Sequence, residues 1–452
     1  MYIGLDFGTT NSSVALYDGT TLTLLPLDPR STANPRVLRS TLFITSEGAA
    51  YIGREAIDRF LEGNVGREID YQWRFVGEAE LTFADIGTVM QALYATVDAN
   101  APGRLFQSIK TALRDRGFTH TNVFGRYYTL EELIALVLSL VKMRVEDTLQ
   151  TKVTGVVLGR PVHYATDAEA DALAFKRMQH ACKLAELPDI LFLEEPTAAA
   201  LAYARNVRTA QRVLVFDFGG GTLDVTIMQL DDAGRPTFLA TDGVPVGGDV
   251  LDRRIVMGRL LRQFGEGATI GPRQLPFPAH VLEHLTEWQS IVDLTQPRYL
   301  DIIEEGVMAG SKPRELRALR SLARRNYGLP MYEEVERAKV RLSDANETTI
   351  SMHMDEIDFD EPLPRWDFER LIGPDARQIE RCVDRVLAAA RLSPADIDVV
   401  LRTGGSSRVP RFVRMLANKF GEEKLQEMDV FTGVASGLAI AAWERGRQSW
   451  GG

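Results

Sequence analysis

The sequence has 452 residues, of which 45% are hydrophobic and 25% charged, a composition that is typical of globular proteins and excludes a fibrous or disordered chain. Because single hydrophobic cores stop growing beyond roughly 250–300 residues, a chain of this length predicts more than one core. The formal net charge of −10 and the pI near 5.3 give no electrostatic basis for a nucleic-acid partner.

The sequence shows no sign of a secreted or membrane-bound protein. Its two cysteines, Cys182 and Cys382, are too few for a disulfide framework and lie on helical patterns, so we expect buried free thiols. The apolar run Leu133–Val141 is far shorter than the roughly 20 residues of a membrane span, and Asp6 interrupts the apolar start of the chain. We therefore expect a cytoplasmic protein with no membrane partner.

The chain begins with a strand that ends in a glycine-containing turn. The apolar segment Tyr2–Phe7 carries Asp6 near its end and is followed by the turn Gly8–Asn11 and by a second apolar stretch. Glycine lets the backbone approach a ligand closely, so that successive N–H groups point at an anion. Asp6 is placed to hold a cation or its water shell.

After the first turn we expect a hairpin Val14–Leu25 and a connector Pro26–Pro35. The stretch from Arg39 to about Arg116 then combines short strands and helices, which indicates a small lobe attached to the first half of the chain. Its predicted elements are the strands Thr41–Thr45 and Tyr51–Gly53, the helix Arg54–Leu61 and, within an insertion from Asn64 to Arg104, a helix near Val89–Ala95.

Strands and helices then alternate. Thr129 and Glu132 form a capping-box pattern ahead of an amphipathic helix, and Pro196 suits the first turn of a later helix. The elements that follow are the strands Val153–Leu158 and Ile190–Leu193 and helices over 167–186 and Thr197–Ala204. This order predicts an α/β sheet with functional groups at the strand ends.

A second strand, turn and strand module occurs half a chain later. Val213–Phe216 is apolar, and Asp217 stands ahead of the turn Gly219–Thr222. Asp6 and Asp217 are 211 positions apart, as are Gly8 and Gly219. By itself such a segment could be an ordinary hairpin turn, but the pair predicts two similar halves that face one nucleotide, each with a phosphate-binding turn and one acid.

The rest of the second half is largely helical and charged. Its predicted elements are a strand Val225–Gln229, helices over 250–344 with interruptions at Gly265–Pro278 and Lys312-Pro313, a β section Thr348–Phe359, a helix Phe368–Ala390, a strand Val399–Leu401, a Gly-rich loop Thr403–Pro410 and a final helix Gly433–Arg445. We expect lobe I over 1–206, with a smaller subdomain at about 39–116, and lobe II over 207–452, with a smaller subdomain at about 250–364.

Six segments, taken in order, resemble the motif set of the actin-like ATPase domain of Hsp70 chaperones. They are Ile3–Ser12, Leu193–Ala200, Phe216–Asp224, Val246–Asp252, Val335–Ser343 and Val399–Pro410. The resemblance covers essentially the whole chain. It implies an α/β, ribonuclease H-like duplicated fold with two lobes, four subdomains and a central cleft that binds ATP or ADP with Mg²⁺.

The resemblance also implies roles for the two turns. Phosphoryl transfer needs the γ-phosphate held in line with a nucleophile and its charge neutralised by a metal ion and by hydrogen-bond donors. The residues expected to bind phosphate are Gly8, Thr9, Thr10, Asn11, Gly219, Gly220, Gly221 and Thr222, with Gly247 and Gly248 beside them.

The expected metal residues are Asp6, Asp217 and Glu195, since Mg²⁺ keeps most of its waters and takes one or two carboxylates. The expected catalytic set is Lys110, Glu195, Asp217 and Thr222, with Asp224 assisting. Lys110 resembles the family's catalytic lysine, and Glu195 its cleft glutamate that orients the attacking water. Without the resemblance, Glu195 could simply complement a helix dipole, and a lone lysine is usually a surface residue.

Adenosine is expected between a helix and a loop. Glu336, Lys339 and Ser343 share one helix face. Without the resemblance, such a face would more often be exposed to solvent. The facing wall is Gly404, Gly405, Ser406 and Arg408. Val340 stands where the family usually has an arginine stacked on adenine, and loss of such a cation costs about 0.5–2 kcal/mol of binding.

The end of the chain differs from full-length Hsp70 proteins. Trp443–Gly452 shows neither the acidic, leucine-rich linker nor the peptide-binding domain that follow the ATPase domain. We therefore expect no C-terminal substrate-binding domain and a similarity to the short YegD-type Hsp70-like proteins, which are described as chaperones.

Three functional hypotheses remain open at this point. The first is an Hsp70-like, slowly hydrolysing ATPase that acts as a chaperone or as a nucleotide-switched partner of another protein. The second is a phosphotransferase of the sugar-kinase type, and the third is an actin-like filament protein. Rossmann and P-loop hypotheses fail because their glycine motifs are absent from the sequence.

Overall fold

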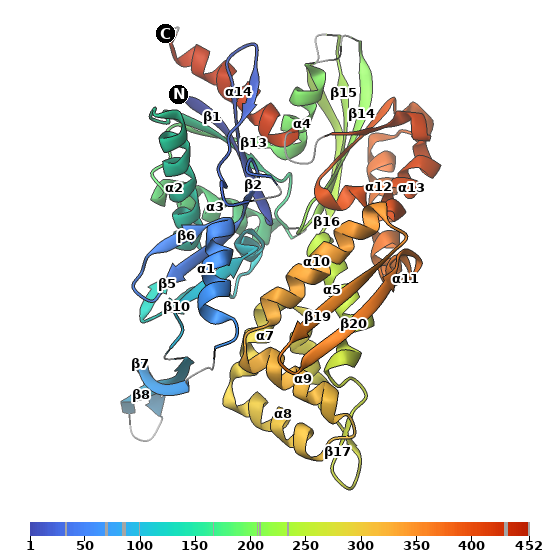
Figure 1. Ribbon diagram of the computed structural model, residues 1–452. Helices are drawn as coiled ribbons and strands as arrows, with labels where there is room; N and C mark the ends of the chain where they lie inside the picture. Colours follow the sequence, from blue (N-terminus) through green and yellow to red (C-terminus); the bar gives the residue numbers. More distant parts are fainter. Residues whose placement is uncertain are drawn as a thin grey trace.

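A computed structural model describes residues 1–31, 34–67, 71–83, 87–98, 100–165, 167–205, 207, 209–232, 235–428 and 433–450. Figure 1 shows two α/β lobes side by side, each with a central sheet at one end and a smaller subdomain at the other. The expected actin-like fold class is thereby confirmed.

The sheet of the first lobe has the strand order β13-β12-β1-β2-β3, with β4 also paired to β2. Its strands are β1 (Tyr2–Phe7), β2 (Asn11–Tyr17), β3 (Leu22–Leu24), β4 (Leu38–Arg39), β12 (Gly155–Arg160) and β13 (Ile190–Glu194). The central strand β1 is antiparallel to β2 and parallel to β12.

The sheet of the second lobe repeats this arrangement in the order β16-β15-β14-β21-β22. Its strands are β14 (Gln211–Phe218), β15 (Leu223–Leu230), β16 (Pro236–Val244), β21 (Val399–Thr403) and β22 (Leu425–Glu427). Here β14 is antiparallel to β15 and parallel to β21. Asp6 and Asp217 are therefore at equivalent positions, each one residue before the end of a central strand.

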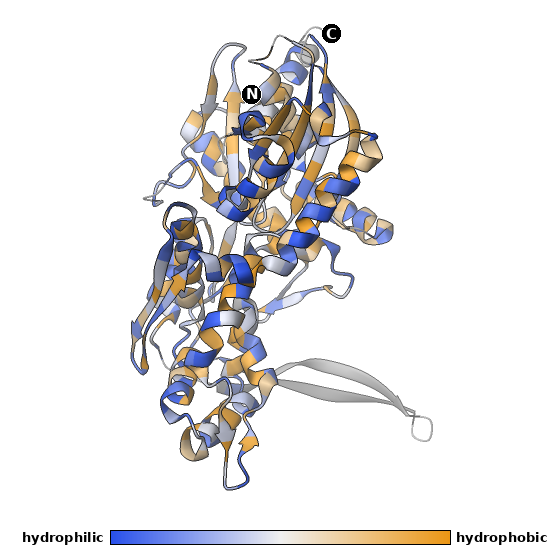
Figure 2. Ribbon diagram, turned by 90° about the vertical axis from the view of Figure 1, so that its right-hand side faces the viewer, coloured by the Kyte–Doolittle hydropathy of each residue, from blue (hydrophilic) through white to orange (hydrophobic). Residues whose placement is uncertain are grey.

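Helices cover the outer faces of both sheets. In the first lobe they are α2 (Leu130–Leu149) and α3 (Ala168–Leu184), and in the second α12 (Gly373–Ala390) and α13 (Pro410–Phe420). The predicted capping box of α2 is present, because Thr129 accepts from Glu132 N and Glu132 accepts from Thr129 N. Figure 2, seen from the side of the second lobe, shows apolar and polar residues alternating along the helices that face the viewer.

Two further helices lie between the sheets. They are α4 (Glu195–Ala204) and α14 (Gly433–Trp450). One apolar cluster contains Ala198 from α4, Leu438 from α14, Val157 from the first sheet and Val213 from the second. Helix α14 also contacts β1, β2 and β12 although it ends the chain (Figure 1), so the last helix of the second half packs on the sheet of the first.

The smaller subdomain of the first lobe is built on a three-stranded sheet in the order β6-β5-β9. Its elements are β5 (Thr41–Thr45), β6 (Ala50–Ile52), α1 (Arg54–Asn64), β7 (Tyr71–Phe83), β8 (Gly87–Asp98), β9 (Gly103–Gln107), the 3₁₀ helix Ile109–Arg114, β10 (Thr121–Val123) and β11 (Arg126–Tyr128).

The prediction of a helix near Val89–Ala95 is wrong. This segment lies in β8, which pairs antiparallel with β7 over almost its full length. The backbone hydrogen bonds of the segment are thus satisfied by a partner that the sequence did not identify. Tertiary pairing of this kind overrides local propensity.

The smaller subdomain of the second lobe is mainly helical, as expected. Its elements are α5 (Gly248–Ile255), β17 (Thr269–Ile270), β18 (Leu275–Pro276), α6 (Ala279–Glu283), α7 (Trp288–Ile291), α8 (Pro297–Ala309), α9 (Pro313–Arg324), α10 (Gly328–Asp344), β19 (Glu347–Met354), β20 (Ile357–Pro364) and α11 (Arg365–Leu371). The predicted helix Phe368–Ala390 is divided between α11 and α12.

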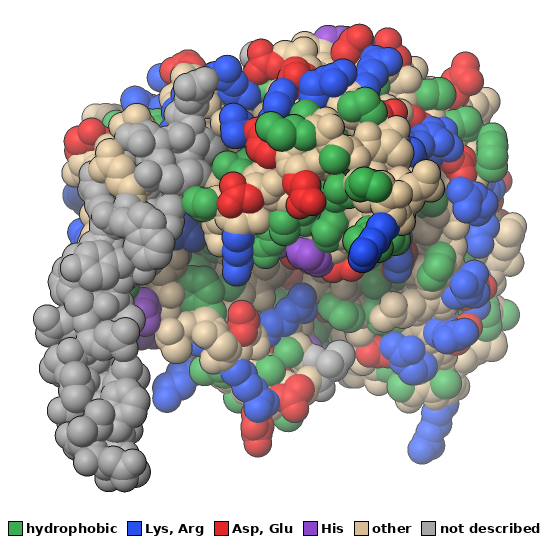
Figure 3. Space-filling view, turned by 90° about the horizontal axis from the view of Figure 1, so that it is seen from below, with side chains coloured by type: hydrophobic (Ala, Val, Ile, Leu, Met, Phe, Trp, Pro, Cys, Tyr) green, Lys and Arg blue, Asp and Glu red, His purple; other side chains and the backbone are tan. Residues whose placement is uncertain are grey.

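The surface carries mixed charge. Figure 3 shows basic and acidic side chains interspersed over the lower face, without a region of one sign. Cys182 and Cys382 are buried free thiols, as expected. Within the described part of the chain, no helix has the length and apolar character that crossing a membrane requires.

The crossing of α4 and α14 depends on a glycine. A Cβ on Gly437 would lie 1.7 Å from the carbonyl oxygen of Ala198, far inside van der Waals contact. We therefore predict that Gly437→Ala lowers the melting temperature by several degrees, because packed helices cannot separate without losing apolar contacts. Gly373→Ala is the matched control, since its Cβ would meet only Arg377 at 3.7 Å. Equal melting temperatures for the two variants would contradict this account of the crossing.

Candidate functional site

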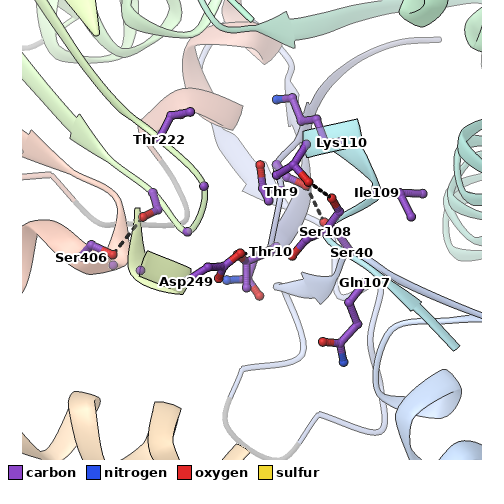
Figure 4. A pocket seen from close by; sticks show the side chains of 18 of the residues that line it. Thr9, Thr10, Ser40, Gln107, Ser108, Ile109, Lys110, Thr222, Asp249 and Ser406 are labelled. Atoms are coloured by element: carbon purple, nitrogen blue, oxygen red, sulfur yellow. Dashed lines mark hydrogen bonds between the residues drawn. The ribbon is translucent and has the colours of Figure 1, made fainter. Parts of the chain in front are cut away.

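A cavity of about 930 Å³ lies between the two lobes. Its lining comes from both central sheets and from both smaller subdomains. Figure 4 shows Thr9, Thr10 and Lys110 on one side of this space and Thr222 and Ser406 on the other. Asp6 and Asp217 face the same cavity, so the two acids near the ends of the central strands converge on one site.

The two turns touch each other across the cleft. A Cβ on Gly220 would lie 1.8 Å from Oγ1 of Thr10, and one on Gly221 would lie 3.0 Å from Oγ1 of Thr9. Only glycine at 220 allows this approach. Every predicted residue of the two turns lines the cavity, namely Gly8, Thr9, Thr10, Asn11, Gly219, Gly220, Gly221 and Thr222.

Neighbouring segments brace each turn by hydrogen bonds. In the first lobe, Oγ of Ser40 donates to the carbonyl of Gly8 (2.7 Å). In the second lobe, the N–H of Gly248 (3.0 Å) and Oγ of Ser406 (2.9 Å) both donate to the carbonyl of Gly219. The turns are therefore held rigid, which lets them bind a ligand without reorganising.

Lys110 and Glu195 form a buried ion pair in the cavity. Nζ of Lys110 lies 2.9 Å from Oε1 of Glu195, and the two side chains are 9% and 14% exposed. Burial lowers the pKa of Lys110, but the acidic groups around it, Glu195 first, and the hydrogen bond to Glu195 together outweigh burial, so the net pKa is raised. Lys110 is thus a fixed cation, which excludes the alternative of a solvated surface lysine.

Asp6, Asp217 and Asp224 lie beside this pair. Burial, followed by the charge of Glu195, raises the pKa of Asp6 to about 7 and that of Asp217 well above its usual value. Asp6 also contributes to the raised pKa of Asp217. Burial raises the pKa of Asp224 to about 7, and this carboxylate accepts from Oγ1 of Thr222 (3.2 Å). The cluster thus brings several carboxyl groups close together, with Lys110 as a neighbouring cation.

Such a cluster fits a hydrated magnesium ion. Buried carboxylates that repel one another are stabilised by a divalent cation. Among the residues that the structure describes, no three acidic, histidine or cysteine side chains are grouped as metal ligands. Mg²⁺ does not require such a group, because it takes one or two carboxylates and keeps several waters.

The cavity also fits phosphate. Oγ1 of Thr10 is buried and has no hydrogen-bond partner within the described ranges. A buried hydroxyl without a partner is costly, and an anion in the cavity would satisfy it. The glycine turns next to it supply backbone N–H groups of the kind that bind phosphate.

At the other end of the cavity, the face of α10 expected to bind adenosine is present. Glu336, Lys339 and Ser343 line the cavity, as do Gly404, Gly405 and Ser406 on the facing loop. Nζ of Lys339 donates to Oδ2 of Asp252 (2.7 Å) and to the carbonyl of Gly248 (3.1 Å). We refer to the part of the cavity formed by Glu336, Lys339, Ser343 and Ser406 as the nucleoside end.

Glu336 has a partner from the first lobe. Both of its carboxylate oxygens accept from the guanidinium of Arg39. Burial raises the pKa of Glu336, but the charge and hydrogen bonds of Arg39, together with the charges of Lys339 and Arg337, outweigh burial, so the net pKa is lowered. Glu336 is therefore ionised and held in one orientation.

Two residues that were expected to bind the nucleotide, Arg408 and Gly247, do not line the cavity. Arg408 lies outside the cavity lining, and its guanidinium is 3.2 Å from Glu427. Arg341 follows Val340 in the chain, but its guanidinium donates to Thr348 and Glu334. It therefore does not take the place of the arginine that the family usually stacks on adenine. Gly247 is behind the lining, where its backbone packs against Gly220.

Sequence reasoning missed several residues of the site. They are Arg39, Ser40, Ser108, Tyr164, Asp249 and Asp252, all of which line the cavity. Asp249 and Asp252 belong to a segment that carried the resemblance, and their charge could have marked them. Ser40 and Arg39 gave no local signal, because they act through partners distant in sequence.

The fold and the site define a class of protein. Two halves with the same strand order each carry a glycine turn and one acid, and both meet in one cleft. This is the architecture of the actin-like ATPases.

Comparison with known proteins gives the family. The family model described as Hsp70 protein matches residues 2–276 and 324–444. The chain is 28% identical to "Chaperone protein dnaK" of Cyanidioschyzon merolae and 27% identical to "Chaperone protein DnaK" of Thermus thermophilus, over 97% of this chain and 61% and 60% of those proteins. It is 30% identical to "Heat shock 70 kDa protein BIP3" of Oryza sativa subsp. japonica, over 97% of this chain and 56% of that protein. The chain belongs to the Hsp70 family, and it spans about three fifths of the length of these relatives.

Stability should depend on pH through three buried acids. Burial raises the pKa of Asp6, Asp224 and Asp252 to about 7 each. Each of these groups has a higher pKa in the folded than in the unfolded chain, so the folded state binds more protons between about pH 4 and 7 and loses stability as pH rises through that window. We predict that the nucleotide-free protein melts a few degrees lower at pH 8 than at pH 6.

Thermal unfolding at both pH values tests this expectation. Asp224→Asn should flatten the dependence, since it removes one of the three titrating groups. A higher melting temperature at pH 8 than at pH 6 would contradict the predicted sign.

Proposed function

We propose that this protein binds and slowly hydrolyses ATP with Mg²⁺, and that its nucleotide state controls its contact with another protein, as a chaperone or a switched partner. The observation that carries the proposal is the convergence of Asp6, Asp217 and the Lys110–Glu195 pair on one cavity between two glycine turns. Membership of the Hsp70 family supports this hypothesis over the sugar-kinase and filament alternatives.

Each residue of the site has a task in this proposal. The glycine turns and Thr10 bind the phosphates through N–H and hydroxyl donors. Lys110, fixed beside Glu195, neutralises charge at the γ-phosphate. Glu195 accepts a hydrogen bond from the attacking water and orients it. In the nucleotide complex the Thr222 hydroxyl leaves Asp224, to which it donates here (3.2 Å), and donates to the transferred phosphate instead. Magnesium, held by Asp6 and Asp217 through its water shell, would draw negative charge from the phosphates.

The protein partner is proposed by chemical class alone. The relatives whose printed names include "chaperone" suggest an unfolded or assembling polypeptide as client. The similarity to the short YegD-type proteins and the cytoplasmic location stay predictions from the sequence.

Calorimetry and single-turnover hydrolysis test the proposal. We expect Mg²⁺·ATP to bind, and removal of Mg²⁺ by EDTA to weaken binding at least tenfold. Lys110→Ala should bind ATP but hydrolyse it about 10²–10³-fold more slowly, which is the usual cost of removing one preorganised charge donor.

Lys152→Ala is the matched control for Lys110→Ala. The side chain of Lys152 is 85% exposed and pairs with Glu146 on the surface. The Lys152→Ala variant should hydrolyse ATP at the rate of the unsubstituted protein. Absence of Mg²⁺-dependent ATP binding by the unsubstituted protein would refute the proposal.

The position of Arg408 leads to a separate prediction. Because its guanidinium pairs with Glu427 outside the cavity, Arg408→Ala should leave the Kd for ATP within about twofold. Ser406→Ala, in contrast, removes the donor to Gly219 and should raise the Kd about threefold to tenfold, as loss of one hydrogen bond typically does. Equal effects in a titration of the two variants would show that Arg408 enters the site after all.

A further inference from the structure

Helix α10 turns one face toward the smaller subdomain of the first lobe. Leu329 packs into a cluster with Phe43 and Ile57 of that subdomain. One turn later, Glu333 lies 3.4 Å from Arg54, and after one more turn Glu336 meets Arg39. Spacings of four and three residues place these side chains in one row. The row joins the lobes along the edge of the cavity.

The last contact of this row differs from the others. Arg39 and Glu336 form a two-point ion pair, in which Nη1 donates to Oε1 at 3.0 Å and Nη2 donates to Oε2. Their side chains are 29% and 33% exposed. Both residues line the cavity, whereas Arg54 does not. The Arg39–Glu336 pair therefore belongs to the nucleoside end as well as to the contact between lobes.

Arg39 is the cation that orients Glu336 there. Lys339, on the same helix face, donates to Asp252 and Gly248 instead. Val340 carries no charge, and Arg408 is paired outside the cavity. The orientation of the Glu336 carboxylate is thus set by a residue of β4 in the opposite lobe.

The ion pair leaves Glu336 able to accept further hydrogen bonds. An ionised carboxylate has about four lone-pair sites, and the guanidinium fork occupies two of them. The remaining sites can accept from a pair of neighbouring hydroxyls, such as those of ribose. A planar two-point pair fixes the carboxylate in advance, so less side-chain entropy is lost when a ligand binds.

We propose that Arg39 is a specificity-determining positioning residue, which holds Glu336 across the cleft as the acceptor for the ribose hydroxyls and makes recognition of the sugar depend on both lobes. This inference rests on the proposed function, since it assumes that the cleft binds ATP. The ligand class is a ribonucleotide, preferred over its 2′-deoxy form.

Calorimetry with three ligands tests the proposal: Mg²⁺·ATP, Mg²⁺·2′-deoxy-ATP and Mg²⁺·tripolyphosphate, which has no nucleoside. The unsubstituted protein should prefer ATP to 2′-deoxy-ATP by about tenfold, the usual effect of one lost hydrogen bond to a charged group. Arg39→Gln should bring this ratio close to one and leave the Kd for tripolyphosphate within about twofold. Unchanged tripolyphosphate binding also shows that the variant is folded.

Arg54→Gln is the matched control, because it breaks the neighbouring ion pair between lobes without altering a cavity residue. It should keep the preference for ATP. Arg39→Lys retains the charge but loses the two-point geometry, and it should lower the ratio nearly as far as Arg39→Gln.

The remaining outcomes overturn the inference. An unchanged ratio in Arg39→Gln, or no preference in the unsubstituted protein, would show that Arg39 does not act on the sugar. If Arg39→Gln and Arg54→Gln weakened all three ligands equally, the two pairs would only keep the lobes closed. Failure of the unsubstituted protein to bind ATP at all would instead refute the proposed function.

Discussion

The buried negative charge between the lobes is the constraint on which the rest of the structure depends. Asp6, Asp217, Asp224 and Glu195 face one cavity. Burial, followed by the charge of Glu195, raises the pKa of each of the three aspartates and makes their ionisation costly. Lys110 offsets part of this charge through its contact with Glu195. The glycine turns complete the site with donors for an anion. A cleft of this kind is best stabilised when a cation and a polyanion occupy it together, as a nucleotide with its metal ion does.

Duplication explains how one chain builds such a site. Each half places an acid near the end of a central strand and a turn directly after that strand. Because the two halves face each other across the cleft, both acids and both turns come together. Helices α4 and α14 hold this arrangement, since they pack between the sheets and cross where Gly437 meets Ala198. If one lobe moves against the other, the packing of α4 against α14 and the row of contacts along α10 have to change.

The two ends of the cavity differ in how closely they follow the Hsp70 pattern. The phosphate end keeps both predicted turns, their two acids, Lys110 and Glu195 within one cavity, whereas the predicted Gly247 lies behind its lining. The nucleoside end has Val340 in place of an arginine, Arg408 paired with Glu427, and Arg39 reaching across from the first lobe to Glu336. Phosphate chemistry is set by charge and backbone donors, which tolerate little change, whereas a sugar or base can be bound by several arrangements of side chains. Variation within the family is thus expected at this end.

The sequence by itself determined the duplicated α/β architecture, the two turns and their acids, and the capping box of α2. These features depend on local patterns and on glycine or carboxylate at fixed positions. It could not identify the strand β8, whose backbone bonds are made by a distant segment. Nor could it identify the hydrogen bond from Ser40 to Gly8 in the first turn. The ion pair of Arg39 with Glu336 joins residues that are 297 positions apart, and it too was out of reach. Only the tertiary structure decides such contacts, because they arise where separate elements pack, and no local periodicity encodes which side chains will meet there.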